Sequence, residues 1–299
     1  MLIESEEYPS DVRRFGGWTL GVGLLASTAV AAQRAIGDAD LAETLARVGR
    51  RVETYYTRAR TIVCTERVLI QPLRSDLSPD GSGRRLVYEL RVEWEPPASG
   101  QLAGHAEVVR RLVSVNGRPP DPKAEPGCID PAPTSPEPLA IFLPALRNQY
   151  AFSWAGRGRA NGRASVRLDY RDAISTLSEI LWKGECVTIS VPAKTLGRAW
   201  VDAETGDVPR LDERLAGLFD VPVPREHQAH GAPATMIIER NDTSIRYQNV
   251  RFSDPDETVV LPSTINTLSI VRNAGTPRLR VTQTFSDYKR FITGSRLVG

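Results

Sequence analysis

Apolar and polar residues alternate with a period of two along much of this chain, and this alternation limits the fold more than any other feature. Its strictest form is in residues 86–94, where the apolar positions are Leu86, Tyr88, Leu90, Val92 and Trp94. Successive side chains of a β-strand point to opposite faces, so the pattern predicts a strand with one apolar and one mostly polar face. Residues 278–286 likewise place Leu279, Val281 and Phe285 together. One-sided burial is typical of antiparallel sheets, since parallel sheets are covered on both faces.

Short turn sequences separate the predicted strands. Asn116-Gly117 and Asn161-Gly162 are typical of two-residue hairpin turns, because both positions of such a turn need a positive φ. Two more hairpins are predicted, at residues 197–203 with 208–215 and at residues 263–271 with 278–286. Consecutive strands joined by short turns favour a meander. The sequence therefore predicts a mainly β fold of the α+β kind, built on an antiparallel sheet.

Two segments show the helical period instead. In residues 38–59, charged residues separate an apolar stripe, which consists of Leu41, Leu45, Val48, Val52, Tyr55 and Ala59. A second stripe in residues 137–150 consists of Leu139, Phe142, Leu143, Leu146 and Tyr150. Pro144 is expected to kink this second helix, because proline cannot donate the helical hydrogen bond. Both predicted helices are able to cover the apolar face of the sheet.

The N-terminus has the parts of a secretory signal. Residues 15–33 are uncharged, Arg13-Arg14 precede them, and an A-x-A cleavage site lies at Ala29-Val30-Ala31. We therefore expect residues 1–31 to be a signal peptide and residues 32–299 to form one domain, with a Pro-rich insertion at about 119–138. The expected location is periplasmic or associated with the outer membrane. An uncleaved anchor is the alternative, since the run is near the lower limit of about 18 residues for a spanning helix.

Three cysteines, Cys64, Cys128 and Cys186, are widely separated and form no C-x-x-C motif. In an exported protein, one disulfide and one buried thiol are the expected arrangement. Cys128 lies in a Pro/Gly-rich loop that a covalent link would hold, whereas Cys64 lies in a strand-like run. We therefore predict a Cys128–Cys186 disulfide and a buried Cys64.

Charge and motifs give little sign of catalysis. The formal net charge is only +2 and no long run of Lys or Arg occurs, so nucleic acid is not an expected partner. Neither G-x-S-x-G nor H-E-x-x-H is present, which removes the common signatures of serine hydrolases and zinc proteases. We predict no catalytic residues and no cofactor.

Two polar clusters have simple structural explanations. His227 and His230 have a spacing that suits a metal, but they lie in a Pro/Gly/Ala loop without a clear third ligand, which favours a solvated loop. The acidic residues from Asp202 to Asp207 lack the spacing and the closing Glu of a calcium loop. A hairpin turn with a positive φ at Gly206 accounts for them. We predict no metal site.

Several segments resemble the LolA/LolB-like superfamily of periplasmic lipoprotein carriers. They are residues 197–211 (GRAWVDAETGDVPRL), 247–252 (YQNVRF), 260–262 (VLP) and 285–291 (FSDYKRF), together with the helix before the first strand. The resemblance implies a strongly curved antiparallel sheet, an incomplete β-barrel whose open side is covered by an N-terminal helix and a second helix around a lipid-binding cavity. It also implies no catalytic residues and no cofactor. The chain departs from the carriers in its greater length and its Pro-rich insertion, and no lid-locking arginine can be matched.

The pattern and the resemblance together predict an exported, non-enzymatic, monomeric protein that binds a lipid, an acyl chain or a lipoprotein. The predicted cavity lining is Tyr88, Leu90, Val92, Trp94, Phe142, Leu146, Val281 and Phe285. Two alternatives remain. One is an interaction module of the cell envelope whose sheet is packed shut and whose edge strands bind another envelope protein. The other is a hydrolase of envelope polymers, which would need a cleft that gathers carboxylates or a histidine with a carboxylate.

Overall fold

The computed structural model describes residues 40–56, 58, 62–95, 105–121, 123, 128, 138–173, 179–183, 186–190, 195–228 and 234–290. The chain divides into two units, residues 1–40 and 41–299, and the described residues belong to the second apart from Asp40. The predicted signal peptide and most of the predicted Pro-rich insertion lie outside the described residues. Within these described ranges, no helix has the length and apolar character needed to cross a membrane.

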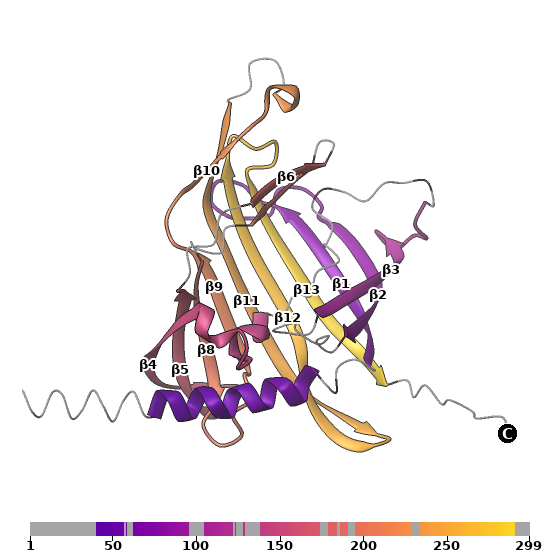
Figure 1. The fold of residues 1–299 in the computed structure, drawn as a ribbon. Coiled ribbons are helices and arrows are strands. Elements are labelled where there is room, and N and C mark those ends of the chain that lie inside the picture. The colour runs from indigo at the N-terminus through magenta and orange to yellow at the C-terminus, as the bar shows by residue number, and fades with distance from the viewer. Residues whose placement is uncertain are drawn as a thin grey trace, which may run out of the picture. The chain divides into compact units, whose positions relative to one another are not determined.

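The described part of the chain has one α-helix, residues 40–56, and it lies within the predicted range 38–59. Figure 1 shows the helix crossing the strands of the sheet. The strands are β1 (Ile62–Pro72), β2 (Arg84–Glu95), β3 (His105–Val115), β4 (Tyr150–Ala160), β5 (Arg163–Asp172), β6 (Glu179–Lys183), β7 (Cys186–Ser190), β8 (Thr195–Asp202), β9 (Arg210–Leu215), β10 (Phe219–Pro222), β11 (Thr235–Ser253), β12 (Asp256–Arg272) and β13 (Arg278–Arg290).

The main sheet is antiparallel and open. Its strand order is β3-β2-β1-β13-β12-β11-β9-β8-β5-β4, and β10 pairs with β11 outside this path. Two meanders, β1 to β3 and β4 to β13, are joined where β1 pairs with β13, while β6 and β7 form a separate hairpin. The edge strands β3 and β4 do not pair with each other in the described ranges, so the sheet does not close into a barrel. The predicted fold class, a mainly β protein with an incomplete antiparallel barrel, is confirmed.

Both Asn-Gly dipeptides form the predicted tight turns, the first closed by a single bridge from Val115 to Arg118 and the second joining two paired strands. Asn116 and Gly117 have φ values of 50° and 78°, and Asn161 and Gly162 have values of 49° and 79°. Two consecutive positive φ angles are typical of the type I′ turn, whose twist matches that of the strands it joins. The second Asn-Gly dipeptide therefore determines where β4 turns into β5.

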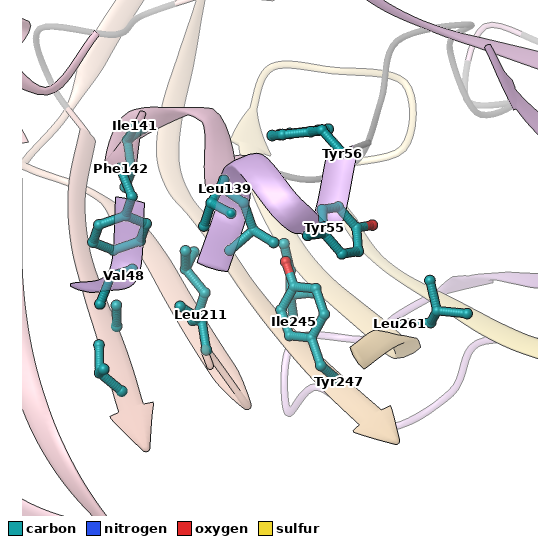
Figure 2. Close-up of a cluster of buried hydrophobic side chains, with 14 of the residues drawn as sticks. Val48, Tyr55, Tyr56, Leu139, Ile141, Phe142, Leu211, Ile245, Tyr247 and Leu261 are labelled. Carbon is teal, nitrogen blue, oxygen red and sulfur yellow. The ribbon is translucent and has the colours of Figure 1, made fainter. Parts of the chain in front are cut away.

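The alternating residues form an apolar face on the side of the sheet that the helix covers. Strand register aligns one row across five strands, from Leu168 through Ala199, Leu211 and Ile245 to Ile265. These five side chains are between 0 and 3% exposed. Figure 2 shows side chains of the helix lying over the strands that carry this row. The helix contributes Leu45, Val48, Val52, Tyr55 and Tyr56 to the same core.

The predicted second helix is wrong. Residues 138–149 form two short 3₁₀ helices, η1 (Pro138–Phe142) and η2 (Arg147–Gln149), separated by a turn. Pro144 has no backbone N–H and disfavours the α conformation at Leu143, so a helix cannot continue through them. The Leu143 N–H instead donates to the carbonyl of Ala140, three residues earlier, over 3.0 Å. Phe142 and Leu143 are nevertheless buried, as their apolar pattern predicted.

The three cysteines are arranged as predicted. Cys128 and Cys186 form a disulfide that links residues 58 positions apart and ties residue 128 to β7. Cys64 lies on β1, is 4% exposed and takes no part in the disulfide.

Candidate ligand-binding site

The predicted lining residues lie mostly on the apolar face but fall into two clusters. Leu90, Phe142 and Phe285 belong to the large core beneath the helix. Tyr88 belongs to a smaller cluster formed by Val68, Ile70, Leu86 and Tyr88, and Val281 packs against that cluster. Leu146 is half-buried in the turn after η1. Val92 and Trp94 are in β2, but their side chains lie outside the described residues.

A buried ion pair lies between these two clusters. Glu66 is on β1, two residues from Cys64 in the large cluster and two from Val68 in the small one. It is 0% exposed, and its carboxylate accepts hydrogen bonds from Arg110 Nε over 2.7 Å and from Gln283 Nε2 over 2.6 Å. Removing a charge from water is costly unless it is paired in this way.

Glu66 is absent from the residues that the sequence pattern singles out. The signal that reveals it is a charged residue in an apolar position of the alternating run from Ile62 to Ile70. Such a residue requires a partner from another strand, and the sequence alone does not say which strand supplies it.

The helix and η1 together form a cover over the apolar face. They touch at Gly49, where an added Cβ would lie 2.9 Å from the carbonyl oxygen of Phe142. An ion pair links the helix to the turn after β8, since Arg51 donates to both carboxylate oxygens of Asp207 over 2.8 and 3.0 Å. The hydrogen bond to Asp207 raises the pKa of Arg51. The cover is thus held by apolar packing and by a half-exposed ion pair.

Aromatic side chains pack over the apolar face near β4 and β5. The ring of Tyr170 lies across Gly197 on the neighbouring strand, where a Cβ would come within 1.9 Å of the ring. Its hydroxyl donates to Glu213 on the next strand over 2.8 Å. Phe142 contacts Tyr170 and Phe152, with ring centroids 6.5 and 5.5 Å apart. Burial raises the pKa of Glu213 and of Tyr170, because both lose contact with water.

An open pocket of about 820 Å³ lies against β4, β5, β8, β9, β11, β12 and the start of β13. Its lining includes Trp200 but neither Ala199 nor Val201, the neighbours of Trp200 that are buried on the apolar face. The ring of Tyr170 covers Gly197 on the apolar face, so the pocket reaches Gly197 from the other side. Most of its lining residues therefore lie on the polar face, opposite the helix, while Phe152, Tyr170 and Glu213 of the apolar face also border it. None of the six predicted lining residues with described side chains borders it.

The two polar clusters of the sequence do not form a metal site in the described residues. No group of three or more metal-ligating side chains occurs there. His227 stacks on Trp182 with ring centroids 4.5 Å apart, whereas His230 lies outside the described ranges. Asp202 accepts hydrogen bonds from the N–H groups of Glu204 and Thr205, both over 2.9 Å, and Gly206 has a φ of 76°. The acidic segment is the predicted hairpin turn.

No protein-family model matches the chain, and no curated protein matches it. The solved structures that are similar to it include the following three. An outer membrane lipoprotein-sorting protein domain from Vibrio parahaemolyticus is 8% identical with a TM-score of 0.37, over 82% of this chain and 92% of that chain. A LolA superfamily protein from Nitrosomonas europaea is 10% identical with a TM-score of 0.36, over 82% and 92%. A DUF1329 family protein from Desulfovibrio piger is 8% identical with a TM-score of 0.36, over 84% and 93%.

Proposed function

We propose that this protein is an exported, non-enzymatic binder of a lipid acyl chain or of the acyl chains of a lipoprotein. The acyl chain would lie on the apolar face of the sheet, in the space that the helix and η1 occupy when the cover is closed. One observation carries this proposal: an apolar face that crosses the sheet is covered by one helix and one 3₁₀ segment, rather than by a second sheet. Part of a cover of this size can be exchanged for a ligand.

The energies of the exchange limit how far the cover can open. An acyl chain with about 15 methylenes gains about 12 kcal/mol on burial, at about 0.8 kcal/mol for each methylene. The cover buries nine apolar side chains, which are Leu45, Val48, Val52, Tyr55, Tyr56, Leu139, Ile141, Phe142 and Leu143. At about 1.5–3 kcal/mol each, exposing all nine would cost about 14–27 kcal/mol. A bound acyl chain therefore offsets the exposure of part of the cover, about four to eight of these side chains, and not the displacement of the whole cover.

The ion pair between the helix and the turn after β8 is too weak to prevent opening. The Arg51 and Asp207 side chains are 41% and 21% exposed. Ion pairs at such partly exposed positions contribute only about 0.2–1 kcal/mol. The pair orients the closed cover, and the apolar contacts supply most of its stability.

The first test asks whether the protein carries a lipid. Native mass spectrometry of the mature protein, purified from a periplasm without detergent, is expected to show an adduct of lipid mass. Lipid analysis of an organic extract then identifies it. A bare polypeptide mass, together with no uptake of the fluorescent fatty acid cis-parinaric acid, would refute the proposal.

A variant localises the binding site. Phe142→Ala removes a side chain that is 0% exposed and leaves a cavity between η1 and the sheet. The protein should lose about 3–5 kcal/mol of stability without ligand. We expect cis-parinaric acid to bind this variant more tightly than the wild type and to raise its melting temperature more. Leu218→Ala is the control, because Leu218 is 58% exposed and far from the cover in sequence. If the wild type, Phe142→Ala and Leu218→Ala bind cis-parinaric acid equally, the cover is not part of the binding site.

A second function, an interaction module of the envelope, is favoured by the edge strand β3. In the described ranges, β3 pairs only with β2, and Val109 and Val113 on it are 44% and 45% exposed. An open edge with exposed apolar residues can accept a strand from another protein. A lipid-free protein that retains a partner protein, and loses it when Val113 is changed to Lys, would support this function instead.

A further inference from the structure

The polar face of the sheet carries a row of arginines that crosses the open pocket. Strand register aligns Arg171, Leu196, Arg214, Asp242, Leu268 and Arg280 directly across β5, β8, β9, β11, β12 and β13. All six residues line the pocket. We call them the arginine row.

The three arginines of this row carry charge that the protein does not neutralise. Arg171, Arg214 and Arg280 are exposed, and no hydrogen bond or ion pair joins any of their side chains to another described residue. An exposed guanidinium presents five N–H donors in a planar fork that matches a phosphate or a carboxylate. The three groups are thus available to a ligand.

The carboxyl groups around the pocket already have partners, an arginine for each of three aspartates and the hydroxyl of Tyr170 for Glu213. Asp169 accepts two hydrogen bonds from Arg198, over 2.6 and 2.9 Å. Asp212 accepts two from Arg210, over 3.0 and 2.6 Å, and Asp242 is paired with Arg240. The pocket and these ion pairs together hold six arginines, Arg171, Arg198, Arg210, Arg214, Arg240 and Arg280, against the four carboxyl groups of Asp169, Asp212, Glu213 and Asp242, so the region has a net positive charge.

Asp169 lies near one arginine of the row, Arg214. Its pKa is lowered, first by the hydrogen bond from Arg198 and then by the charges of Arg198, Arg167 and Arg214. Arg214 therefore lies close enough to stabilise a negative charge inside the pocket. A second anion beside it would be stabilised in the same way.

The spacing of the row selects the shape of the ligand. Arg171 and Arg214 are two strands apart, about 10 Å, and Arg280 is three strands further, about 14 Å. Leu196 and Leu268 lie between these charges. The pocket volume of about 820 Å³ is within the usual range for sites that bind small molecules. A ligand that fills it has anionic groups separated by an apolar part.

We infer that this pocket binds an amphipathic molecule with at least two phosphate or carboxylate groups, and that Arg214 is its central contact. The arginine row lies on the face opposite the acyl-binding surface proposed above, so the inference does not depend on that function. The ligand is either a soluble small molecule or the anionic headgroup of a membrane lipid, because both have the same chemistry.

Calorimetric titration with hexane-1,6-diyl bisphosphate tests the inference, with inorganic phosphate and phosphatidylglycerol vesicles as further probes. Arg214→Gln should weaken binding of the bisphosphate by about tenfold or more, because a hydrogen bond to a charged group contributes about 1.5–3 kcal/mol. Arg118→Gln is the matched control, since Arg118 is exposed just after the turn that follows β3, outside the pocket. It should bind like the wild type, and both variants should melt like the wild type.

The probes also distinguish the sources of the ligand. Binding of the bisphosphate that is lost in Arg214→Gln supports a soluble ligand, and vesicle binding lost in the same variant supports a lipid headgroup. If the wild type binds neither the bisphosphate nor the vesicles, the inference is overturned. Equal affinity for inorganic phosphate and the bisphosphate would overturn the role of the spacing between the arginines.

Discussion

The contact between Gly197 and Tyr170 gives the sharpest prediction for the stability of the sheet. Gly197 lies on β8 between Tyr170 on β5 and Glu213 on β9, and the tyrosine ring fills the space above it. In Gly197→Ala, the new Cβ would lie 1.9 Å from Cζ and 2.3 Å from Cε1 and Cε2 of Tyr170. No rotation of a methyl group relieves such a contact, so the ring must move and its hydrogen bond to Glu213 must break.

The expected cost follows from three contributions. Inserting a carbon into a packed core costs about 1–3 kcal/mol. Losing the hydrogen bond and leaving the mostly buried Glu213 carboxyl unsatisfied costs about 1–3 kcal/mol more. Alanine is better than glycine inside a strand by about 0.5–1 kcal/mol, which acts in the opposite direction. Gly197→Ala should therefore destabilise the protein by about 1–5.5 kcal/mol.

Urea unfolding followed by tryptophan fluorescence measures this change. Gly158→Ala is the matched control, because its Cβ would meet only the Arg167 side chain, at an ordinary 3.5 Å from Cδ. Tyr170→Phe removes the hydroxyl and keeps the ring, so it separates the hydrogen bond from the packing. If Gly197→Ala unfolds at the same urea concentration as Gly158→Ala, the close packing of Tyr170 on Gly197 is refuted.

Two further predictions concern buried charge. Arg110→Met should destabilise the protein by about 3–5 kcal/mol because it leaves the buried Glu66 carboxylate without its cation. Adding Glu66→Gln to Arg110→Met should restore most of this stability in urea unfolding, since Gln283 keeps a partner. Equal stability of Arg110→Met and of the double variant would contradict the reasoning. Burial raises the pKa of Glu213 above its value in the unfolded chain. The protonated Glu213 carboxyl therefore contributes to stability at low pH, and this contribution is lost as the pH rises through the folded-state pKa. Glu213→Gln should therefore lose less stability than the wild type between about pH 4 and about pH 7, and parallel curves would exclude Glu213 as the cause.

The strands and turns could be predicted from the sequence because local pattern determines them. The alternation in residues 86–94 placed Tyr88 and Leu90 on the buried face, and they are 7% and 5% exposed. The Asn-Gly dipeptides located two tight turns, and the second of them joins the β4–β5 hairpin, since few residues other than Asn and Gly tolerate a positive φ. The stripe in residues 137–150 was misleading for a physical reason: Pro144 breaks the helix, yet Phe142 and Leu143 are still buried.

The candidate sites could be predicted less well, because they depend on the register between strands far apart in the sequence. Period-two alternation assigns a residue to a face but does not say what covers that face. It could not separate a filled core from an open cavity at Leu90 or Phe285. Nor could it align Arg171 with Arg214 and Arg280, because that row exists only once β5, β9 and β13 occupy their places in one sheet.

The alternation that defines the fold also separates the two proposed sites. On β9, Glu213 points to the apolar face and binds Tyr170, whereas the next residue, Arg214, lies in the row that crosses the pocket. Neighbouring residues of one strand therefore serve opposite faces of the same sheet. Arg214→Gln should leave fatty-acid binding unchanged, and Val52→Ala, a change in the helix outside the pocket lining, should leave bisphosphate binding unchanged. If each variant instead weakened both activities, the two faces would be coupled through the sheet, and the ligand would control the opening and closing of the cover rather than occupy an independent site.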